Sequence, residues 1–117
     1  MIYLAVPYSH DSPAVRHERF EAVNKYAAYL MEQGLQVFSP ISHSHPIQEH
    51  FKDPKTTWEF WAEHDIPFLK MCSHVHVLCL DGWKESVGVT DEIRIADELS
   101  IPVVFIPPNY GDYLCQR

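Results

Sequence analysis

The sequence has few basic residues and contains no long apolar run. Nine Lys and Arg stand against sixteen Asp and Glu, so the net charge is −7. This charge argues against duplex nucleic acid or an anionic membrane as a partner, because both require a basic face. No apolar stretch approaches the length of a membrane span, and the first residues lack the basic region of a signal peptide.

Cysteine is also scarce. The three cysteines, Cys72, Cys79 and Cys115, are odd in number and form no C-x-x-C pair. We therefore expect reduced thiols in a cytoplasmic protein. The sequence also lacks internal repeats and low-complexity tracts, so nothing divides it into smaller units.

The remaining composition is typical of one globular domain, with 117 residues of which 46% are hydrophobic and 21% charged. Apolar runs predict strands at 2–6, 35–39, 75–80 and 103–106. Helical periodicity predicts helices at about 12–34, 56–72 and 87–99, and Pro67 predicts a break or kink near Asp65 and Ile66 in the second of them. This alternation predicts an α/β fold: a single domain over 1–117 with a flavodoxin-like or Rossmann-like, doubly wound parallel sheet of four to five strands.

Capping residues mark the ends of these elements. Asp11 or Ser12 is expected to cap the first helix, and Gly34 to end it. Thr56 begins a capping-box pattern that would start the second helix. Between the strand at 35–39 and the second helix, residues 41–55 (ISHSHPIQEHFKDPK) are predicted to form a long polar loop. Such a loop is usually functional or mobile in so small a domain.

The segment 81–98 (DGWKESVGVTDEIRIADE) combines the end of a strand, a Ser-x-Gly turn and the start of a helix. Free backbone N–H groups and the helix dipole make such a start a site for anions. Asp91 and Glu92 are expected in the first helical turn, where a carboxylate facing an anionic ligand is unfavourable unless it has a chemical role. The alternative is that both only complement the helix dipole.

Parallel sheets bind ligands outside the carboxyl ends of their strands. This rule brings four segments to one edge of the sheet: 7–11, 39–50, 81–88 and the residues after 106. The tail, 107–117, is a candidate for a subunit interface.

Eight histidines suggest a metal site, and His43, His45 and His50 share the predicted loop. Their spacing matches no established zinc pattern, so we predict neither a metal nor a cofactor. His43 and His45 are either hydrogen-bond donors at the mouth of a pocket or solvated loop residues.

Several aromatic residues could stack on a planar base, or pack in the core instead. Core packing is favoured for at least one of Trp58 and Trp61, whereas Trp83 is the better pocket candidate. Four carboxylates, Asp65, Asp81, Asp91 and Glu92, matter most. Two carboxyl groups, one nucleophilic and one exchanging protons, suffice for glycosidic cleavage through an oxocarbenium-like transition state.

Tyr3, Asp65 and the spacing Ser86-x-Gly88-x-x-x-Glu92 resemble the nucleoside 2-deoxyribosyltransferase superfamily, which includes the 2′-deoxynucleoside 5′-monophosphate N-glycosidases. The segments PYSH (7–10), SHPI (44–47) and GW-x-x-S-x-G (82–88) are similar to a set of small bacterial and phage domains of unassigned function in that superfamily. The resemblance extends to about residue 106.

The resemblance implies a mechanism. Glu92 would attack C1′ of a deoxyribose and form a covalent deoxyribosyl–enzyme, Tyr3 would orient Glu92, and Asp65 would manage the proton of the departing base. Water or a second base would then resolve the intermediate with net retention. The other candidate binding residues are Pro7, Ser9, His10, His43, His45, Asp81 and Trp83.

The resemblance also bears on the substrate, a small-molecule nucleotide or nucleoside. Ser86 with Gly88 implies a 5′-monophosphate, since the nucleoside transferases have an aspartate at the position of Ser86. The monophosphate hydrolases carry an arginine in the loop after the first strand. Here that loop is PYSH, so Ser9 and His10 would substitute directly, or Arg16 or Arg19 would reach in from the helix.

The superfamily completes its pocket with C-terminal residues of a neighbouring subunit. Asn109, Tyr110 and Tyr113 are the candidates here, and a homodimer or larger assembly is expected. The competing interpretation is a non-catalytic nucleotide-binding or sensing module, which needs the pocket but not the carboxylate.

Overall fold

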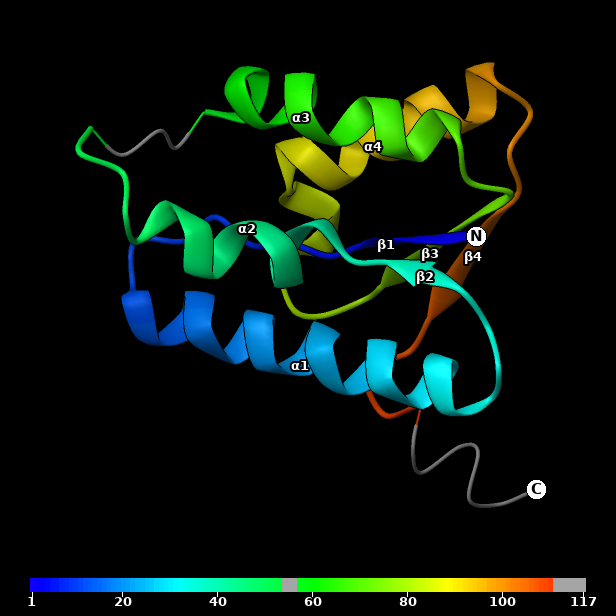
Figure 1. Ribbon diagram of the computed structural model, residues 1–117, viewed down its shortest axis with the longest axis horizontal. Coiled ribbons are helices and arrows are strands. Elements are labelled where there is room, and N and C mark those ends of the chain that lie inside the picture. The colour runs from blue at the N-terminus through cyan, green and yellow to red at the C-terminus, as the bar shows by residue number, and fades with distance from the viewer. Residues whose placement is uncertain (54–56, 111–117) are drawn as a thin grey trace.

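Four parallel strands form one sheet in a computed structural model that describes residues 1–53 and 57–110. They are β1 (Ile2–Ala5), β2 (Val37–Phe38), β3 (His74–Leu78) and β4 (Val103–Ile106), arranged in the order β2-β1-β3-β4 (Figure 1). This is the order of flavodoxin-like doubly wound sheets. The predicted α/β fold with a parallel sheet is confirmed.

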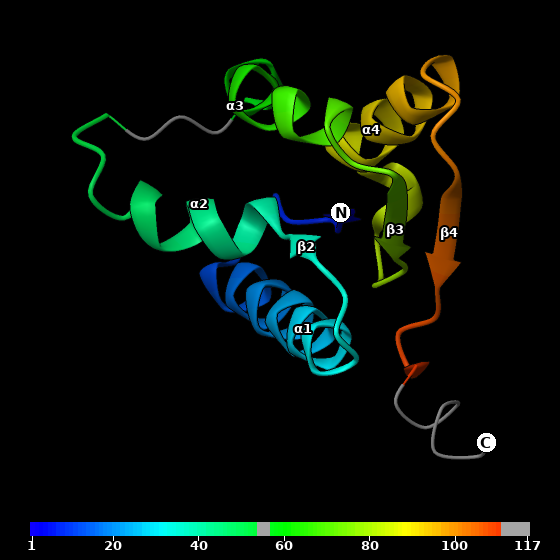
Figure 2. The ribbon, with the colours of Figure 1, turned by 45° about the vertical axis from the view of Figure 1, so that its right-hand side comes forward.

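Helices cover both faces of this sheet. α1 (Pro13–Glu32) packs on the face that carries Ile2 and Leu4, whereas α3 (Trp58–Lys70) and α4 (Val87–Glu98) pack on the face of Tyr3 and Ala5. α2 (Pro40–Gln48) contacts α1 and β1, and Figures 1 and 2 show α3 and α4 together on the opposite side. Because β1 is buried on both faces, its sequence is a continuous apolar run rather than an alternating one.

The ends of α1 follow the predicted capping chemistry. Ser12 is the N-cap, and its Oγ accepts a hydrogen bond from the Val15 N–H at 3.4 Å. Gly34 follows the helix with φ +84°, a left-handed conformation that L side chains rarely adopt. Within residues 1–53 and 57–110, no helix combines the length and the apolar character needed to cross a membrane.

The predicted polar loop at 41–55 is wrong in its first half, because residues 40–48 form α2. Pro40 occupies the first turn, where its missing N–H costs nothing. Tertiary hydrogen bonds hold this weakly helical sequence: Ser42 donates to Asn24 of α1, and the Tyr8 hydroxyl bonds to both His45 and Gln48. Such contacts override the low propensity of a Ser-rich and His-rich segment that also contains an internal proline.

The predicted break near Asp65 and Ile66 does not occur, because α3 runs without interruption from Trp58 to Lys70. Pro67 removes one hydrogen bond to the carbonyl of Glu63, and both residues are exposed, so water can replace that bond. The N-cap of α3 is Thr57. The predicted capping residue, Thr56, lies outside the described residues.

α4 begins where it was predicted, but the position of the carboxylates in it differs from the prediction. A short 3₁₀ helix (Trp83–Glu85) follows Gly82, and α4 already begins at Val87, with Ser86 as its N-cap. The Ser86 Oγ accepts a hydrogen bond from the N–H of Val89 at 3.2 Å. Gly88 therefore lies in the first turn of α4, and Asp91 and Glu92 fall in the second turn rather than the first.

Candidate active site

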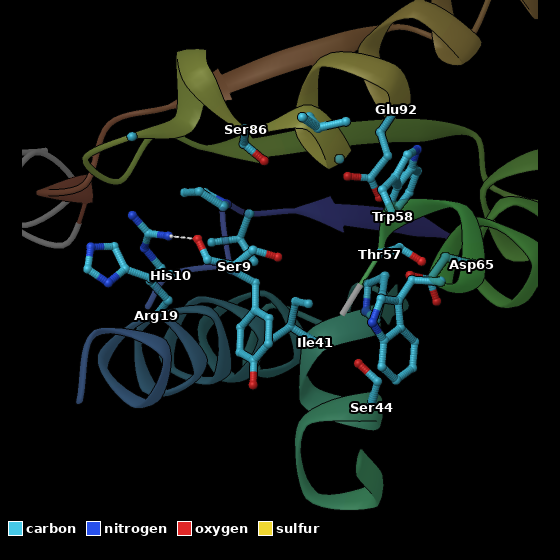
Figure 3. Close-up of a pocket in the computed structure, with 18 of the residues that line it drawn as sticks. Ser9, His10, Arg19, Ile41, Ser44, Thr57, Trp58, Asp65, Ser86 and Glu92 are labelled. Atoms are coloured by element: carbon cyan, nitrogen blue, oxygen red, sulfur yellow. Dashed lines mark hydrogen bonds between the residues drawn. The ribbon is translucent and has the colours of Figure 1, made fainter. Parts of the chain in front are cut away.

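A cavity of about 630 Å³ opens at the carboxyl ends of β1 and β3 (Figure 3). We call it the main cavity. Three of the four segments that were predicted to converge contribute to its wall: 7–10, 40–44 and 82–88. The first two turns of α3 and the second turn of α4 complete it, through Trp58, Trp61, Asp65 and Glu92.

Glu92 points from α4 into the main cavity and is only 6% exposed. Behind it lies Tyr3 of β1, fully buried, whose hydroxyl donates a hydrogen bond to Glu92 Oε2. Burial raises the pKa of Glu92 to about 8, the Tyr3 hydrogen bond opposes this rise, and the nearby charges of Asp65 and Asp91 add to it. Burial likewise keeps the pKa of Tyr3 well above its usual value, so the phenol stays a donor.

Asp65 is the second enclosed carboxyl group of the main cavity. It projects from α3, is 7% exposed, and its pKa is raised to about 6, mainly by burial. Figure 3 shows it at the same end of the cavity as Glu92. Two carboxyl groups with different raised pKa values thus meet at one place, an arrangement suited to dividing nucleophilic and proton-transfer roles.

The opposite end of the main cavity carries a cation. Arg19 of α1 donates from Nη1 to the Ser9 carbonyl at 3.1 Å and from Nη2 to the Asp81 carbonyl at 2.9 Å. Gly82 makes room for it, because a Cβ there would lie 2.9 Å from Nη2. Among the described residues, Arg19 is the only Lys or Arg in the wall, and Figure 3 shows it with His10 at the end away from Glu92.

The start of α4 lies along the wall of the main cavity. Ser86, Val87 and Gly88 line it, and within the described part of the chain the N–H groups of Val87 and Gly88 have no protein acceptor. The Ser86 hydroxyl accepts from Val89 and retains its own hydrogen to donate. Hydrogen-bond donors therefore line the wall where the anion site was predicted.

Trp58 of α3 contacts two residues of α4. Its Nε1–H donates to Asp91 Oδ2 at 2.7 Å, and its ring lies so close to Gly88 that an added Cβ would be 3.3 Å from Cε3. The Trp58 hydrogen bond and the adjacent Arg94 lower the pKa of Asp91. The two consecutive carboxylates therefore differ: Asp91 faces outward and is ionised, whereas Glu92 faces inward.

Four predicted binding residues lie away from the main cavity. Trp83 packs on Phe105, with ring centroids 5.3 Å apart, and Asp81 contributes only its backbone carbonyl to Arg19. His43 and His45 flank Ser44 on α2, so the buried Ser44 reaches the wall instead. The helical conformation of this segment explains the difference, because a helix turns neighbouring side chains to different directions.

His45 is held elsewhere in the fold. Its ring stacks on Phe20 of α1 with centroids 4.1 Å apart, and its Nδ1 bonds to the Tyr8 hydroxyl. Burial lowers the pKa of His45, so the neutral ring is favoured. No three or more His, Cys, Asp or Glu side chains are grouped to hold a metal ion in residues 1–53 and 57–110.

Sequence reasoning missed several wall residues, including Ser44 and Glu85. Ile41 and Ser44 have the i, i+3 spacing of a helix face, which would have revealed them had α2 been recognised. Of the predicted tail residues, Tyr110 packs against Tyr26 of α1 at a centroid distance of 4.7 Å, and Asn109 is exposed. Tyr113 and Cys115 lie outside the described residues.

The sheet order and the cavity at its carboxyl edge define an α/β protein with the fold of nucleoside 2-deoxyribosyltransferases. The structure superposes on a solved 2-deoxyribosyltransferase from the psychrotolerant bacterium Bacillus psychrosaccharolyticus with a TM-score of 0.66 and 23% identity, covering 92% of this chain and 72% of that one. This likeness confirms the predicted resemblance at the level of the fold.

The chain belongs to the family described as domain of unknown function DUF1937, whose profile matches residues 1–107. That match covers nearly all of the described chain, so the strands, the main cavity and both of its ends lie inside the family domain. No curated protein matches the sequence.

Proposed function

We propose that this protein cleaves the N-glycosidic bond of a 2′-deoxynucleotide or 2′-deoxynucleoside through a covalent deoxyribosyl–Glu92 intermediate. The observation that carries the proposal is the buried Tyr3–Glu92 pair at the end of the main cavity that Asp65 shares. A carboxylate enclosed in this way is unfavourable for stability, so its placement on a cavity wall points to chemistry. The fold of the solved 2-deoxyribosyltransferase supports the same reaction class.

In the proposed reaction, an oxygen of ionised Glu92 attacks C1′ while the bond from C1′ to the base nitrogen breaks. Asp65 donates its proton to the departing base, and the Tyr3 hydroxyl keeps Glu92 oriented. Water, or the nitrogen of a second base, then attacks C1′ from the vacated face, giving its proton to Asp65, and Glu92 leaves. Two inversions produce net retention, with hydrolysis in the first case and base transfer in the second.

The proposed reaction depends on the protonation states of Glu92 and Asp65 in the free protein. Glu92, with a pKa of about 8, and Asp65, with a pKa of about 6, together hold one proton between pH 6 and pH 8. The active arrangement needs that proton on Asp65 and not on Glu92. We therefore expect a bell-shaped dependence of kcat/KM on pH, with limbs that belong to the coupled pair rather than to either residue alone.

Arg19, at the end of the main cavity away from Glu92, and the wall formed by the start of α4 favour a 5′-monophosphate over a nucleoside. Arg19, Ser86 and the free N–H groups of Val87 and Gly88 supply donors suited to phosphate oxygens. The distribution of charge along the cavity thus matches a substrate with a neutral sugar at one end and an anion at the other. We further propose a cytoplasmic homo-oligomer, in keeping with the resemblance.

The decisive experiment separates the substrates by chromatography. Purified protein is incubated with deoxynucleoside 5′-monophosphates and the matching deoxynucleosides, with and without a second free base, and released base is measured. Release from monophosphates without an acceptor would support a nucleotide hydrolase. Exchange only with nucleosides would support transfer and would remove the phosphate role from Ser86. No release of base from any substrate by folded protein would overturn the proposal.

A second candidate is a non-catalytic nucleotide-binding module. It is favoured by the raised pKa of Glu92, which leaves the acid largely protonated at neutral pH and able to donate a hydrogen bond to a ligand. Calorimetric binding of a nucleotide without product, and equal binding by Glu92→Gln, would support this candidate. The glutamine amide keeps a donor where the protonated acid has one.

A further inference from the structure

A second hollow, of about 560 Å³, lies beside the main cavity. We call it the outer groove. It is lined on the α4 side by Thr90, Asp91 and Arg94, which face away from Glu92. The residues that line both hollows are Trp58 and Glu59 at the start of α3 and 85–87 before and at the start of α4. These shared residues form the boundary between the main cavity and the outer groove.

Trp58 is the large side chain of that boundary. Its ring rests on Gly88, which lines the main cavity, and its N–H reaches Asp91, which lines the outer groove. The indole therefore spans the contact between α3 and α4 and lines both hollows. Glu59, Glu85 and Val87 are exposed, so their side chains can move away more readily than the tethered Trp58.

The position of Trp58 relative to the reacting groups is the second observation. Figure 3 shows its indole beside Glu92, at the end of the main cavity that also holds Asp65. A substrate whose C1′ lies at Glu92 and whose phosphate lies at Arg19 places its leaving group near the end that holds Trp58. An indole face is well suited to pack against a flat heterocycle.

From this arrangement we infer that Trp58 determines the leaving-group specificity of the site. Its indole packs against the planar base and separates the main cavity from the outer groove, so that bases with bulky substituents are excluded. This inference rests on the proposed function for the identity of the leaving group. It predicts that shortening Trp58 joins the two hollows and admits larger bases.

Asp91 acts in this scheme as a positioning residue. Its Oδ2 holds the indole N–H, while its Oδ1 accepts from Arg94 Nε at 2.9 Å and Nη2 at 2.6 Å. Arg94 Nη1 in turn donates a hydrogen bond to Glu98 Oε1 at 2.7 Å. A carboxylate fixed on both sides restricts the orientation of Trp58 more than packing on Gly88 would do alone.

The test measures binding of matched free bases by calorimetry, using adenine with N6-benzyladenine and cytosine with N4-benzylcytosine. Wild-type protein is expected to bind the small member of at least one pair and to bind the benzyl member at least tenfold more weakly. Trp58→Ala should bind the small base about tenfold more weakly, as expected for one lost stacking contact, and should bind the benzyl base more tightly than wild type does. Trp58→Leu, which fills part of the helix contact, should show the same reversal in smaller degree.

Trp61→Ala is the matched control, because Trp61 also lies on α3 and lines the main cavity but not the outer groove. It should keep the preference for the small base. The inference is overturned if Trp61→Ala admits the benzyl bases as well as Trp58→Ala does, if Trp58→Ala keeps the wild-type preference, or if wild-type protein binds none of the four bases. Size-limited binding that depends on Trp58 but comes without turnover would retain the inference while the proposed function failed.

The role of Asp91 is tested by a double-mutant cycle on the same binding ratio. Asp91→Ala should lower the preference for the small base several-fold in wild-type protein and should have no effect in Trp58→Phe, which lacks the indole N–H. Glu98→Ala, which removes the other partner of Arg94, should leave the ratio unchanged. An equal effect of Asp91→Ala in both backgrounds would exclude action through the indole.

Discussion

The two ends of the main cavity differ in their exposure to solvent. At the enclosed end, the side chains of Tyr3, Asp65 and Glu92 are almost fully buried by β1, α3 and α4. At the open end, Ser9 and Arg19 belong to partly or fully exposed segments. The enclosed end has altered acid–base properties because desolvation disfavours each carboxylate. The open end keeps a cation in place with two backbone carbonyls and without a carboxylate partner among the described residues. The comparison indicates that burial changes the acid–base properties of one end and that directional hydrogen bonds fix a cation at the other, which under the proposed function would serve chemistry and recognition respectively.

The largest expected effect comes from removing Glu92, the proposed nucleophile, at the enclosed end. Glu92→Gln keeps the shape and a partner for the Tyr3 hydroxyl, so the fold should persist. Base release should fall by roughly 10³-fold or more, as for other essential nucleophiles. The measurement is chromatographic turnover on the best substrate of the panel, with circular dichroism as the check of folding. Turnover at the wild-type level in a folded variant would remove Glu92 from the mechanism.

Arg19→Gln tests the open end. Loss of the guanidinium should lower kcat/KM for monophosphates by about 100-fold, the range expected for charge-assisted hydrogen bonds, while nucleosides are unaffected. Arg16→Gln is the matched control, because Arg16 also donates to a carbonyl of the loop after β1, that of His10, but does not line the main cavity. If both variants weaken both substrates equally, Arg19 only holds the loop in place.

Tyr3→Phe tests the enclosed end of the main cavity without removing either carboxyl group. Without the phenol, the ionised form of Glu92 loses its hydrogen bond, so the pKa of Glu92 should rise further, the maximum of the pH profile should fall, and its alkaline limb should move to higher pH. We expect kcat to fall about tenfold near neutral pH, because a pKa higher by about one lowers the ionised fraction of Glu92 about tenfold. Tyr26→Phe, which loses a bond to His76 away from the cavity, should leave the profile unchanged.

The last effect is on stability and needs no substrate to be measured. The pKa of Glu92 rises on folding from 4.5 to about 8, and that of Asp65 from 3.8 to about 6. Each protonated acid therefore favours the folded state fully below about pH 4, and this contribution is lost as pH rises through 6 for Asp65 and 8 for Glu92. Between pH 5 and pH 9 the free energy of unfolding should fall, by at most about 4 kcal/mol for Glu92.

Urea unfolding at these two pH values checks that expectation. Glu92→Gln should lose most of the pH dependence and should be more stable than wild type at pH 9, whereas Glu63→Gln on the exposed face of α3 should behave as wild type. If the free energy of unfolding changes by the same amount between pH 5 and pH 9 in all three proteins, folding does not raise the pKa of Glu92. Burial would then not alter the acid–base properties of the enclosed end.

Much of this arrangement could be predicted from sequence. The apolar runs predicted strands within about two residues of their true ends, and Ser12 and Gly34 marked α1 correctly. The Ser86-x-Gly88-x-x-x-Glu92 spacing placed its three residues on one cavity wall. The strands and the ends of α1 depend on local periodicity and capping, which neighbouring residues decide, whereas the common site of Ser86, Gly88 and Glu92 was implied by the resemblance.

The errors arose where distant contacts override local preference. α2 forms from a sequence with low helix propensity because Asn24 and Tyr8 hold it, and α3 continues through Pro67 because the affected carbonyl faces water. Once residues 40–48 are helical, His43 and His45 turn away and Ser44 takes their place on the cavity wall. Trp83 similarly lies against Phe105 of β4, a residue that is distant in the sequence.

The sequence by itself determined the alternation of strands and helices in the parallel α/β fold. It also determined that carboxylates follow the strands near the sheet edge and that acidic residues outnumber basic ones. Only the tertiary structure decided that Glu92 is enclosed beside Tyr3 while its neighbour Asp91 faces outward to Trp58, and that Arg19 crosses from α1 to two other loops. The physical reason is range. Strand and helix formation are set within a few residues, whereas desolvation and charge pairing depend on groups that folding brings together from the whole chain.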